Sequence, residues 1–163
     1  MASGPASQGA PAGLALFTDL LEPAFIASLV AFAEDTLVRG RAGELAGKSY
    51  QVPPADWLAR GQGRETVHFG VLVKCNKVLN AKVEPLPPIV LEMFSLLQEA
   101  GVFDAEQRPD TLCLNAYAPG SWVPPHVDSE AFDRPFCTLS LLSQHEVALG
   151  EMRASEELEE GGA

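Results

Sequence analysis

Hydrophobic positions recur at helical spacing in two stretches of the chain. After Pro23, apolar side chains recur every three or four residues as far as Leu37, and Gly40 follows, which predicts a helix that ends before this glycine. A second helix is predicted to be opened by Pro87-Pro88 and to stop at Gly101. We expect both apolar stripes to pack on a sheet. Their members are Phe25, Ile26, Leu29, Val30, Ala33 and Leu37, and Ile89, Leu91, Phe94 and Leu97.

Strands are predicted where β-branched, aromatic and alternating residues gather. Residues 66–73, TVHFGVLV, have strand composition, and the histidine at position 68 is expected to be a packed or surface residue. In residues 111–118, an aliphatic set that should face a core alternates with a polar set that should face a cavity. Residues 136–143 predict another strand. Residues 41–63 have weak periodicity and several Pro or Gly breaks, which predicts an irregular, mobile segment.

His126 and Asp128 have the spacing of a metal-binding pair. Residues i and i+2 of a strand leave the same face about 7 Å apart at Cα, so both side chains can reach one ion. An imidazole and a carboxylate suit a borderline divalent metal, and they make two of the three ligands of the 2-His-1-carboxylate Fe(II) site. The third ligand would be a distant histidine. Taken alone, His-x-Asp also arises by chance, and a loop histidine beside a solvated aspartate is then the simpler interpretation.

The residues around this pair form a longer pattern. It comprises Asn-x-Tyr at 115–117, a Pro-Gly turn, Pro-Pro-His-x-Asp at 124–128 and RPFCTLS at 134–140, preceded by GRE at 63–65, FG at 69–70 and VEPLPP at 83–88. This order resembles the AlkB family of Fe(II)/2-oxoglutarate dioxygenases. It is most similar to the plant and algal branch that demethylates N6-methyladenine in RNA. The resemblance covers residues 14–150.

The resemblance implies a fold and a set of site residues. The fold would be α/β (α+β), a partial double-stranded β-helix or jelly roll with N-terminal helices packed on the sheet. His126 and Asp128 would hold Fe(II), and Asn115 and Tyr117 would bind the cosubstrate 2-oxoglutarate. No catalytic residue beyond the metal ligands is assigned. The candidate RNA contacts are Arg64, Lys74, Lys77 and Arg134.

The activity implied is oxidative demethylation of N6-methyladenine in mRNA, with release of formaldehyde. Residues 151–163 read as an acidic tail, where the family would carry a distal histidine and an arginine for 2-oxoglutarate. His145 lies too soon after Asp128 to be the expected distal ligand. The chain is therefore interpreted as a C-terminally truncated family member. The alternative is a non-catalytic fragment that binds RNA or a protein partner.

Charge is segregated along the chain, whose net charge is −11. Residues 39–82 hold eight Lys or Arg against three acids, whereas the segments on either side are acidic. Such a basic segment can attract the phosphates of single-stranded RNA in an acidic protein, because more distant charges are screened. A solvated basic surface explains the charge equally well. Within this segment Tyr50 and Trp57 could stack on a base or anchor the loop to the core.

The cysteines, the N-terminal residues and the apolar stretches predict where in the cell the protein is found. The three cysteines form no CxxC pair and predict reduced, buried thiols in a cytoplasmic or nuclear protein. Residues 1–13 predict a disordered leader without the features of a secretory signal. The longest apolar stretch, residues 25–33, is too short to span a bilayer, so no membrane partner is expected.

Overall fold

Two long helices and three small antiparallel sheets organise the part of the chain that the structure describes. The structure is a computed structural model, and it describes residues 3–4, 13–74, 76–143 and 146–149. The elements in chain order are β1 (Ser3–Gly4), β2 (Leu16–Phe17), α1 (Pro23–Arg41), β3 (Tyr50–Gln51), α2 (Ala55–Ala59), β4 (Glu65–Phe69), β5 (Leu72–Lys74), β6 (Lys77–Leu79), α3 (Pro88–Glu99), the 3-10 helix η1 (Ala105–Gln107) and β7 (Leu112–Ala116).

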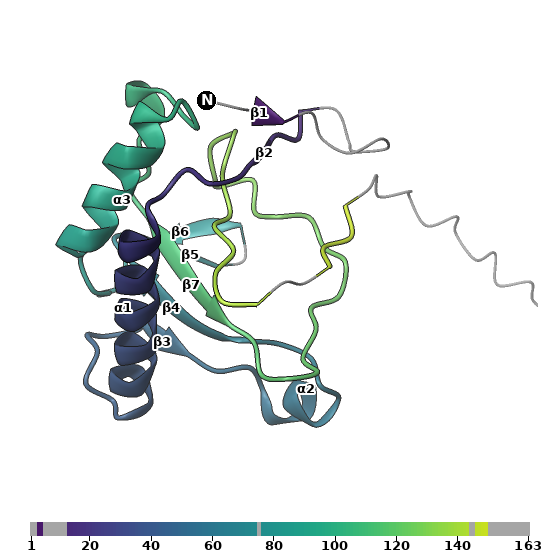
Figure 1. Ribbon diagram of the computed structural model, residues 1–163. Helices are drawn as coiled ribbons and strands as arrows, with labels where there is room; N and C mark the ends of the chain where they lie inside the picture. The colour runs from purple at the N-terminus through teal and green to yellow at the C-terminus, as the bar shows by residue number, and fades with distance from the viewer. Residues whose placement is uncertain (1–2, 5–12, 75, 144–145, 150–163) are drawn as a thin grey trace, which may run out of the picture.

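The central sheet has the strand order β3-β4-β7, and its two faces differ in character. Val67 lies opposite Tyr50 on one side and Leu114 on the other, while Thr66 lies opposite Asn115. Because side chains alternate along a strand, the first set shares one face and the second set shares the other. Helices α1 and α3 gather on one side of the sheet, and the coil after β7 winds on the other side (Figure 1).

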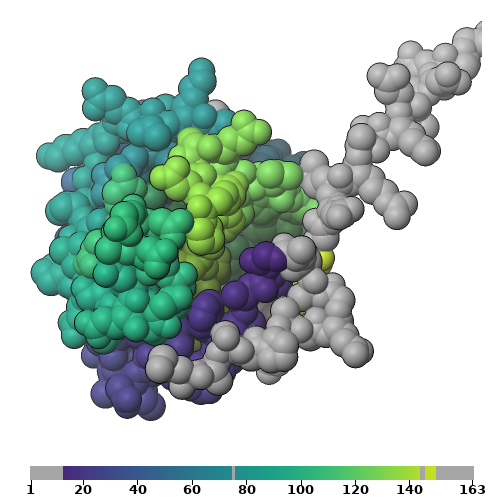
Figure 2. Space-filling view, turned by 90° about the horizontal axis from the view of Figure 1, so that it is seen from above, coloured from purple at the N-terminus to yellow at the C-terminus, as the bar shows by residue number. Residues whose placement is uncertain are grey.

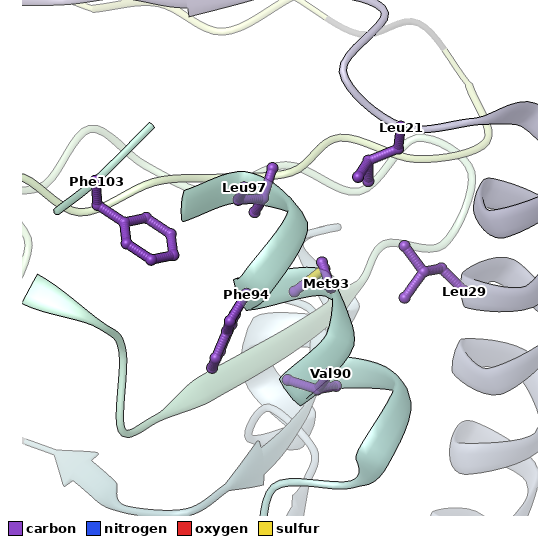
Figure 3. Packing of buried hydrophobic residues seen from close by; sticks show 7 residues of the cluster. All are labelled: Leu21, Leu29, Val90, Met93, Phe94, Leu97 and Phe103. Atoms are coloured by element: carbon purple, nitrogen blue, oxygen red, sulfur yellow. The ribbon is translucent and has the colours of Figure 1, made fainter. Parts of the chain in front are cut away.

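The hydrophobic core lies between the helices and the sheet. Four of its members recur along α3 at helical spacing, as Figure 3 shows, and face side chains from α1 and from the loops that flank both helices. Phe32 of α1 packs on Phe69 of β4, with ring centroids 5.8 Å apart, which joins the helix layer to the sheet. The buried cluster is Leu21, Leu29, Val90, Met93, Phe94, Leu97 and Phe103.

Both predicted helices are present, but the expected end of the first is wrong. Gly40 lies inside α1, which continues to Arg41. A Cβ on Gly40 would lie 2.5 Å from Cδ2 of Tyr50, so the glycine allows the aromatic ring to approach the helix. Gly101 does follow α3, with a φ of 76°, as a helix stop should.

One expected core position on α3 is also wrong. Leu91 is 40% exposed, and the buried face uses Val90 and Met93 instead. The pattern alone was ambiguous, because apolar residues fill five of the first seven positions of α3. The packing of α3 against Leu29 of α1 and against the loop residues Leu21 and Phe103 selects which stripe is buried.

The strands differ from the expected boundaries. Residues 66–73 form two strands because the chain turns at Gly70, whose φ is 75° and whose Cα lies against the carbonyl oxygen of Asp110. Residues 41–63 are more regular than expected, since they contain β3 and α2. The strand at 136–143 is absent, because no described strand offers these residues a hydrogen-bonding ladder. Leu141 nevertheless packs on the core cluster, and Figure 2 shows yellow-green residues beside α3.

The class of the fold is therefore α+β with antiparallel sheets, and the jelly-roll closure stays a prediction. The expectation of buried thiols is wrong for Cys113 and Cys137, which are exposed free cysteines because they lie on the open face of β7 and in the coil after it. Within the described residues, no helix combines the length and the apolarity that crossing a bilayer would need. The acidic tail and most of the leader lie outside the described residues.

A charged cluster fastens the end of α1 to the central sheet. Arg41 donates from Nε and Nη2 to the two carboxylate oxygens of Glu65, at 2.9 and 2.7 Å, and the Tyr50 hydroxyl donates to Oε2 at 2.5 Å. The hydrogen bond from Arg41 lowers the pKa of Glu65. Burial, followed by the contact with Glu65, raises the pKa of Tyr50. This cluster connects α1, β3 and β4.

We expect Leu97→Ala to lower the free energy of unfolding by about 2–5 kcal/mol, because it leaves a cavity in the core. Leu91→Ala is a matched control on the same helix and should cost about 1 kcal/mol or less. Urea denaturation followed by circular dichroism measures both values. Equal losses would contradict the assignment of the buried face of α3.

We also expect Glu65 to make the free energy of unfolding depend on pH in the acid range. Because its pKa is lower in the folded chain, its stabilising contribution is present above the unfolded value of about 4.3 and disappears as pH falls through the folded value. The stability difference between the parent and Glu65→Gln should therefore shrink as pH falls from neutral to about 3. Urea midpoints across this range provide the test. A difference that stays constant with pH would argue against the ionic contact.

Candidate functional site

His126 and Asp128 lie together, although they are not on a strand. The expectation of a strand here is wrong, because residues 123–129 make no ladder. Pro124 and Pro125 lack the backbone N–H groups that pairing with another strand needs. Nε2 of His126 is 3.5 Å from Oδ1 of Asp128, and the two side chains are 50% and 47% exposed. The spacing thus brings both groups to one point at the surface.

A hydrogen bond to the backbone selects the tautomer of His126. Its Nδ1 lies 2.9 Å from the carbonyl oxygen of Pro124, which can only accept. In the neutral ring, Nδ1 therefore carries the proton, and Nε2 keeps a lone pair directed toward Asp128. Histidines that bind metals are commonly oriented in this way by a carbonyl behind the ring.

The pair fits two positions of a divalent metal. Nitrogen and oxygen ligands lie about 2.1 Å from such an ion, so two of them are about 3.0–3.4 Å apart at right or tetrahedral angles. The observed 3.5 Å is close to this range. Among the described residues, no group of three or more His, Cys, Asp or Glu side chains could hold a metal ion. His145, which was not expected to be a ligand, lies outside these residues.

Arg134 holds the segment that follows Asp128. Its Nη1 donates to the carbonyl of Phe132 at 2.6 Å, and its Nη2 donates to the carbonyls of Asp128 and Ser129 at 3.4 and 3.3 Å. The guanidinium also lies 4.8 Å from the ring centroid of Phe136. Arg134 was predicted as an RNA contact, which stays a prediction. The contacts observed here position the segment that follows Asp128.

The open face of the central sheet brings together Arg64, Asn115 and Tyr117. Nε of Arg64 donates to Oδ1 of Asn115 at 2.7 Å, and its guanidinium lies 5.9 Å from the ring centroid of Tyr117. Asn115 and Tyr117 are both exposed on this face, so the predicted alternation of β7 is confirmed, whereas the cavity that they were expected to face stays a prediction. The contact of Arg64 with this pair was missed. This contact could not be read from local sequence, because only the pairing of β4 with β7 places Arg64 beside Asn115 and Tyr117.

The same face carries two titratable groups, His68 and Cys113, near Arg64. Burial, followed by the charges of Lys74 and Arg64, lowers the pKa of His68. Cys113 lies opposite His68 in the sheet, and its thiol donates to Oδ1 of Asn115 at 3.4 Å. Although part of this residue is exposed, desolvation of the thiol raises its pKa to about 11. The thiol is therefore protonated at neutral pH.

The other two candidate RNA contacts belong to the β5–β6 hairpin. Lys74 and Lys77 lie directly opposite each other in its register. Nζ of Lys74 donates to Oε1 of Gln51 at 3.3 Å, which brings the hairpin close to β3. Of the two aromatic residues weighed for stacking on a base, Tyr50 is anchored by Glu65, whereas Trp57 is exposed on α2.

Comparison with known proteins found two similar demethylases. No family model matches the chain. It is 33% identical over 121 residues to RNA demethylase ALKBH9B of Arabidopsis thaliana, a match that covers 69% of this chain and 24% of that protein. It is 26% identical over 153 residues to RNA demethylase ALKBH10B of the same plant, covering 88% of this chain and 26% of the relative. Both similarities support the relationship to the AlkB family. The chain spans about a quarter of the length of these relatives.

We expect Lys74→Gln to raise the pKa of His68, because a nearby cation disfavours the imidazolium form. Lys77→Gln is the matched control from the same hairpin and should leave this pKa unchanged. NMR titration of the histidine ring protons measures both. An unchanged His68 pKa in Lys74→Gln would show that Lys74 does not reach the open face.

Proposed function

We propose that this chain is part of an AlkB-type, Fe(II)/2-oxoglutarate-dependent RNA demethylase that acts on N6-methyladenine in mRNA. The observation that carries the proposal is the His126–Asp128 pair, in which the Pro124 carbonyl leaves Nε2 free for a metal. The similarity to two proteins named RNA demethylases supports the choice of reaction and substrate. A cytoplasmic or nuclear location is part of the same proposal.

Two pairs of described side chains would hold the metal and the cosubstrate. Nε2 of His126 and a carboxylate oxygen of Asp128 would hold Fe(II), and Asn115 and Tyr117 would hold 2-oxoglutarate. When bound, the iron and 2-oxoglutarate supply the oxidation of an N-methyl group by dioxygen. The protein fixes the geometry, since the Pro124 carbonyl orients the imidazole and Arg134 holds the backbone behind Asp128.

Arg64 contributes a cation to the same open face. Because its guanidinium both donates to Asn115 and lies over Tyr117, it orients the two residues proposed for the cosubstrate. 2-Oxoglutarate is a dianion, and hydrogen bonds from a charged donor are about twice as strong as neutral ones. Arg64 is thereby placed to favour a carboxylate beside Asn115.

Single-stranded RNA is the substrate that the chemistry favours. A base inside a duplex must be unstacked before its methyl group can reach a metal, and this costs least in a single strand. The surplus of positive charge in residues 39–82 supplies an attraction for the phosphates. The candidate contacts are those predicted from the sequence, Arg64, Lys74, Lys77 and Arg134.

A second function, non-catalytic binding of RNA or of a protein partner, is favoured by one observation. The described residues supply two candidate metal ligands, His126 and Asp128, but no third. Two ligands do not complete the facial triad. Metal affinity therefore separates the two functions.

The test is an anaerobic titration of the purified chain with Mn(II), with and without 2-oxoglutarate, followed by calorimetry. We expect 2-oxoglutarate to strengthen binding, and His126→Ala or Asp128→Ala to weaken it by at least about tenfold. Asp133→Ala removes an exposed carboxylate from the same segment and should bind as the parent does. Binding that responds neither to 2-oxoglutarate nor to His126→Ala would reject the demethylase site and support the non-catalytic function.

A further inference from the structure

Asn115 accepts two hydrogen bonds at the same side-chain oxygen. Nε of Arg64, which immediately precedes β4, lies 2.7 Å from Oδ1, and the thiol sulfur of Cys113, two residues earlier on β7, lies 3.4 Å from it. Residues i and i+2 of a strand share a face, so the thiol and the amide are neighbours. The pairing of β4 with β7 brings the arginine to the same atom.

The arginine decides which way the Asn115 amide faces. The oxygen and the nitrogen of an asparagine side chain have nearly the same shape, so only the hydrogen-bond partners distinguish its two orientations. Nε of Arg64 can only donate, so the atom beside it must be the amide oxygen. The NH₂ group of Asn115 therefore points away from Arg64, and within the described residues no hydrogen bond involves it.

The thiol of Cys113 occupies the second acceptor position of this oxygen. An amide oxygen has two lone pairs, and Arg64 and Cys113 take one each. A thiolate could not donate, but desolvation raises the pKa of Cys113 to about 11, which keeps the thiol protonated at neutral pH. A molecule on the open face thus meets the Asn115 amide as a donor alone.

The charge of Arg64 strengthens this donor character. Hydrogen bonds in a chain polarise one another, so a charged donor on Oδ1 makes the N–H groups of the same amide better donors. The guanidinium, which lies 5.9 Å from the ring centroid of Tyr117, also adds positive charge to this face. A group that binds beside the amide must therefore offer an oxygen acceptor, and a carboxylate or keto oxygen is favoured over an ammonium group.

We propose that Cys113 is a positioning residue, whose thiol acts with Arg64 to hold the Asn115 amide with its NH₂ group toward a bound acceptor oxygen. Cys113 itself need not touch the ligand. Without the thiol, Arg64 alone would hold the amide oxygen, and the amide could rotate about its one remaining hydrogen bond. The identity of the ligand as 2-oxoglutarate rests on the proposed function.

The first test is a calorimetric titration of the purified, Mn(II)-loaded chain with 2-oxoglutarate. Cys113→Ala removes the donor and should weaken 2-oxoglutarate binding by about threefold, the size expected for one weak hydrogen bond. Cys113→Ser keeps a donor at this position and should bind as the parent does. Cys137→Ala is the matched control and should also bind as the parent does, because it removes an exposed free thiol from the coil after β7.

A second measurement follows the amide itself in the ligand-free chain. The side-chain amide signal of Asn115 in a proton–nitrogen correlation NMR spectrum is assigned by its loss in Asn115→Asp. We expect Cys113→Ala to move the nitrogen signal upfield, toward that of a free asparagine amide, because the amide is then less polarised. Cys113→Ser and Cys137→Ala should leave the signal near its parent position.

An unchanged Asn115 signal in Cys113→Ala would overturn the proposal, and so would parent-like binding of 2-oxoglutarate by this variant. Equal weakening in Cys113→Ala and Cys113→Ser would also overturn it, because a hydroxyl donor would then fail to replace the thiol. If the parent chain does not bind 2-oxoglutarate, the proposed function fails, and the ligand-free spectrum still decides whether Cys113 holds the amide.

Discussion

The pairing of β4 with β7 is the constraint on which the rest of the structure depends. Side chains alternate along both strands, so the register that buries Val67 and Phe69 against the helices also presents Thr66, His68 and Asn115 on the open face. A slip by one residue would exchange the two sets. The hydrophobic effect that holds the helices to the sheet therefore also helps to assemble the polar face.

Much of the fold was accessible from the sequence, because periodicity is a local property. The starts of α1 and α3, the stop at Gly101 and the alternation of β7 were all predicted. The errors have long-range causes. Gly40 lies inside α1, where the absence of a side chain makes room for the distant Tyr50 ring, and residues 136–143 alternate although no described strand pairs with them. A pattern indicates which structure a segment can adopt, and its neighbours decide whether it does.

In the candidate site, too, the local contacts were predictable and the long-range contacts were not. The proximity of His126 and Asp128 was predictable from their spacing of two residues, although the two residues lie on no strand ladder. The Pro124 carbonyl that orients His126 is equally local. In contrast, the contact of Arg64 with Asn115 joins residues 51 positions apart, and only the sheet brings them together.

Gly40 makes room for the ring of Tyr50, a residue of β3. Glycine ordinarily weakens a helix interior by about 1 kcal/mol relative to alanine, so replacing it is a usual route to a more thermostable protein. In α1 that route is closed, since a methyl group would push aside the Tyr50 ring, and the hydroxyl of this tyrosine donates to Glu65. An engineer who seeks a more heat-resistant chain should leave this glycine in place.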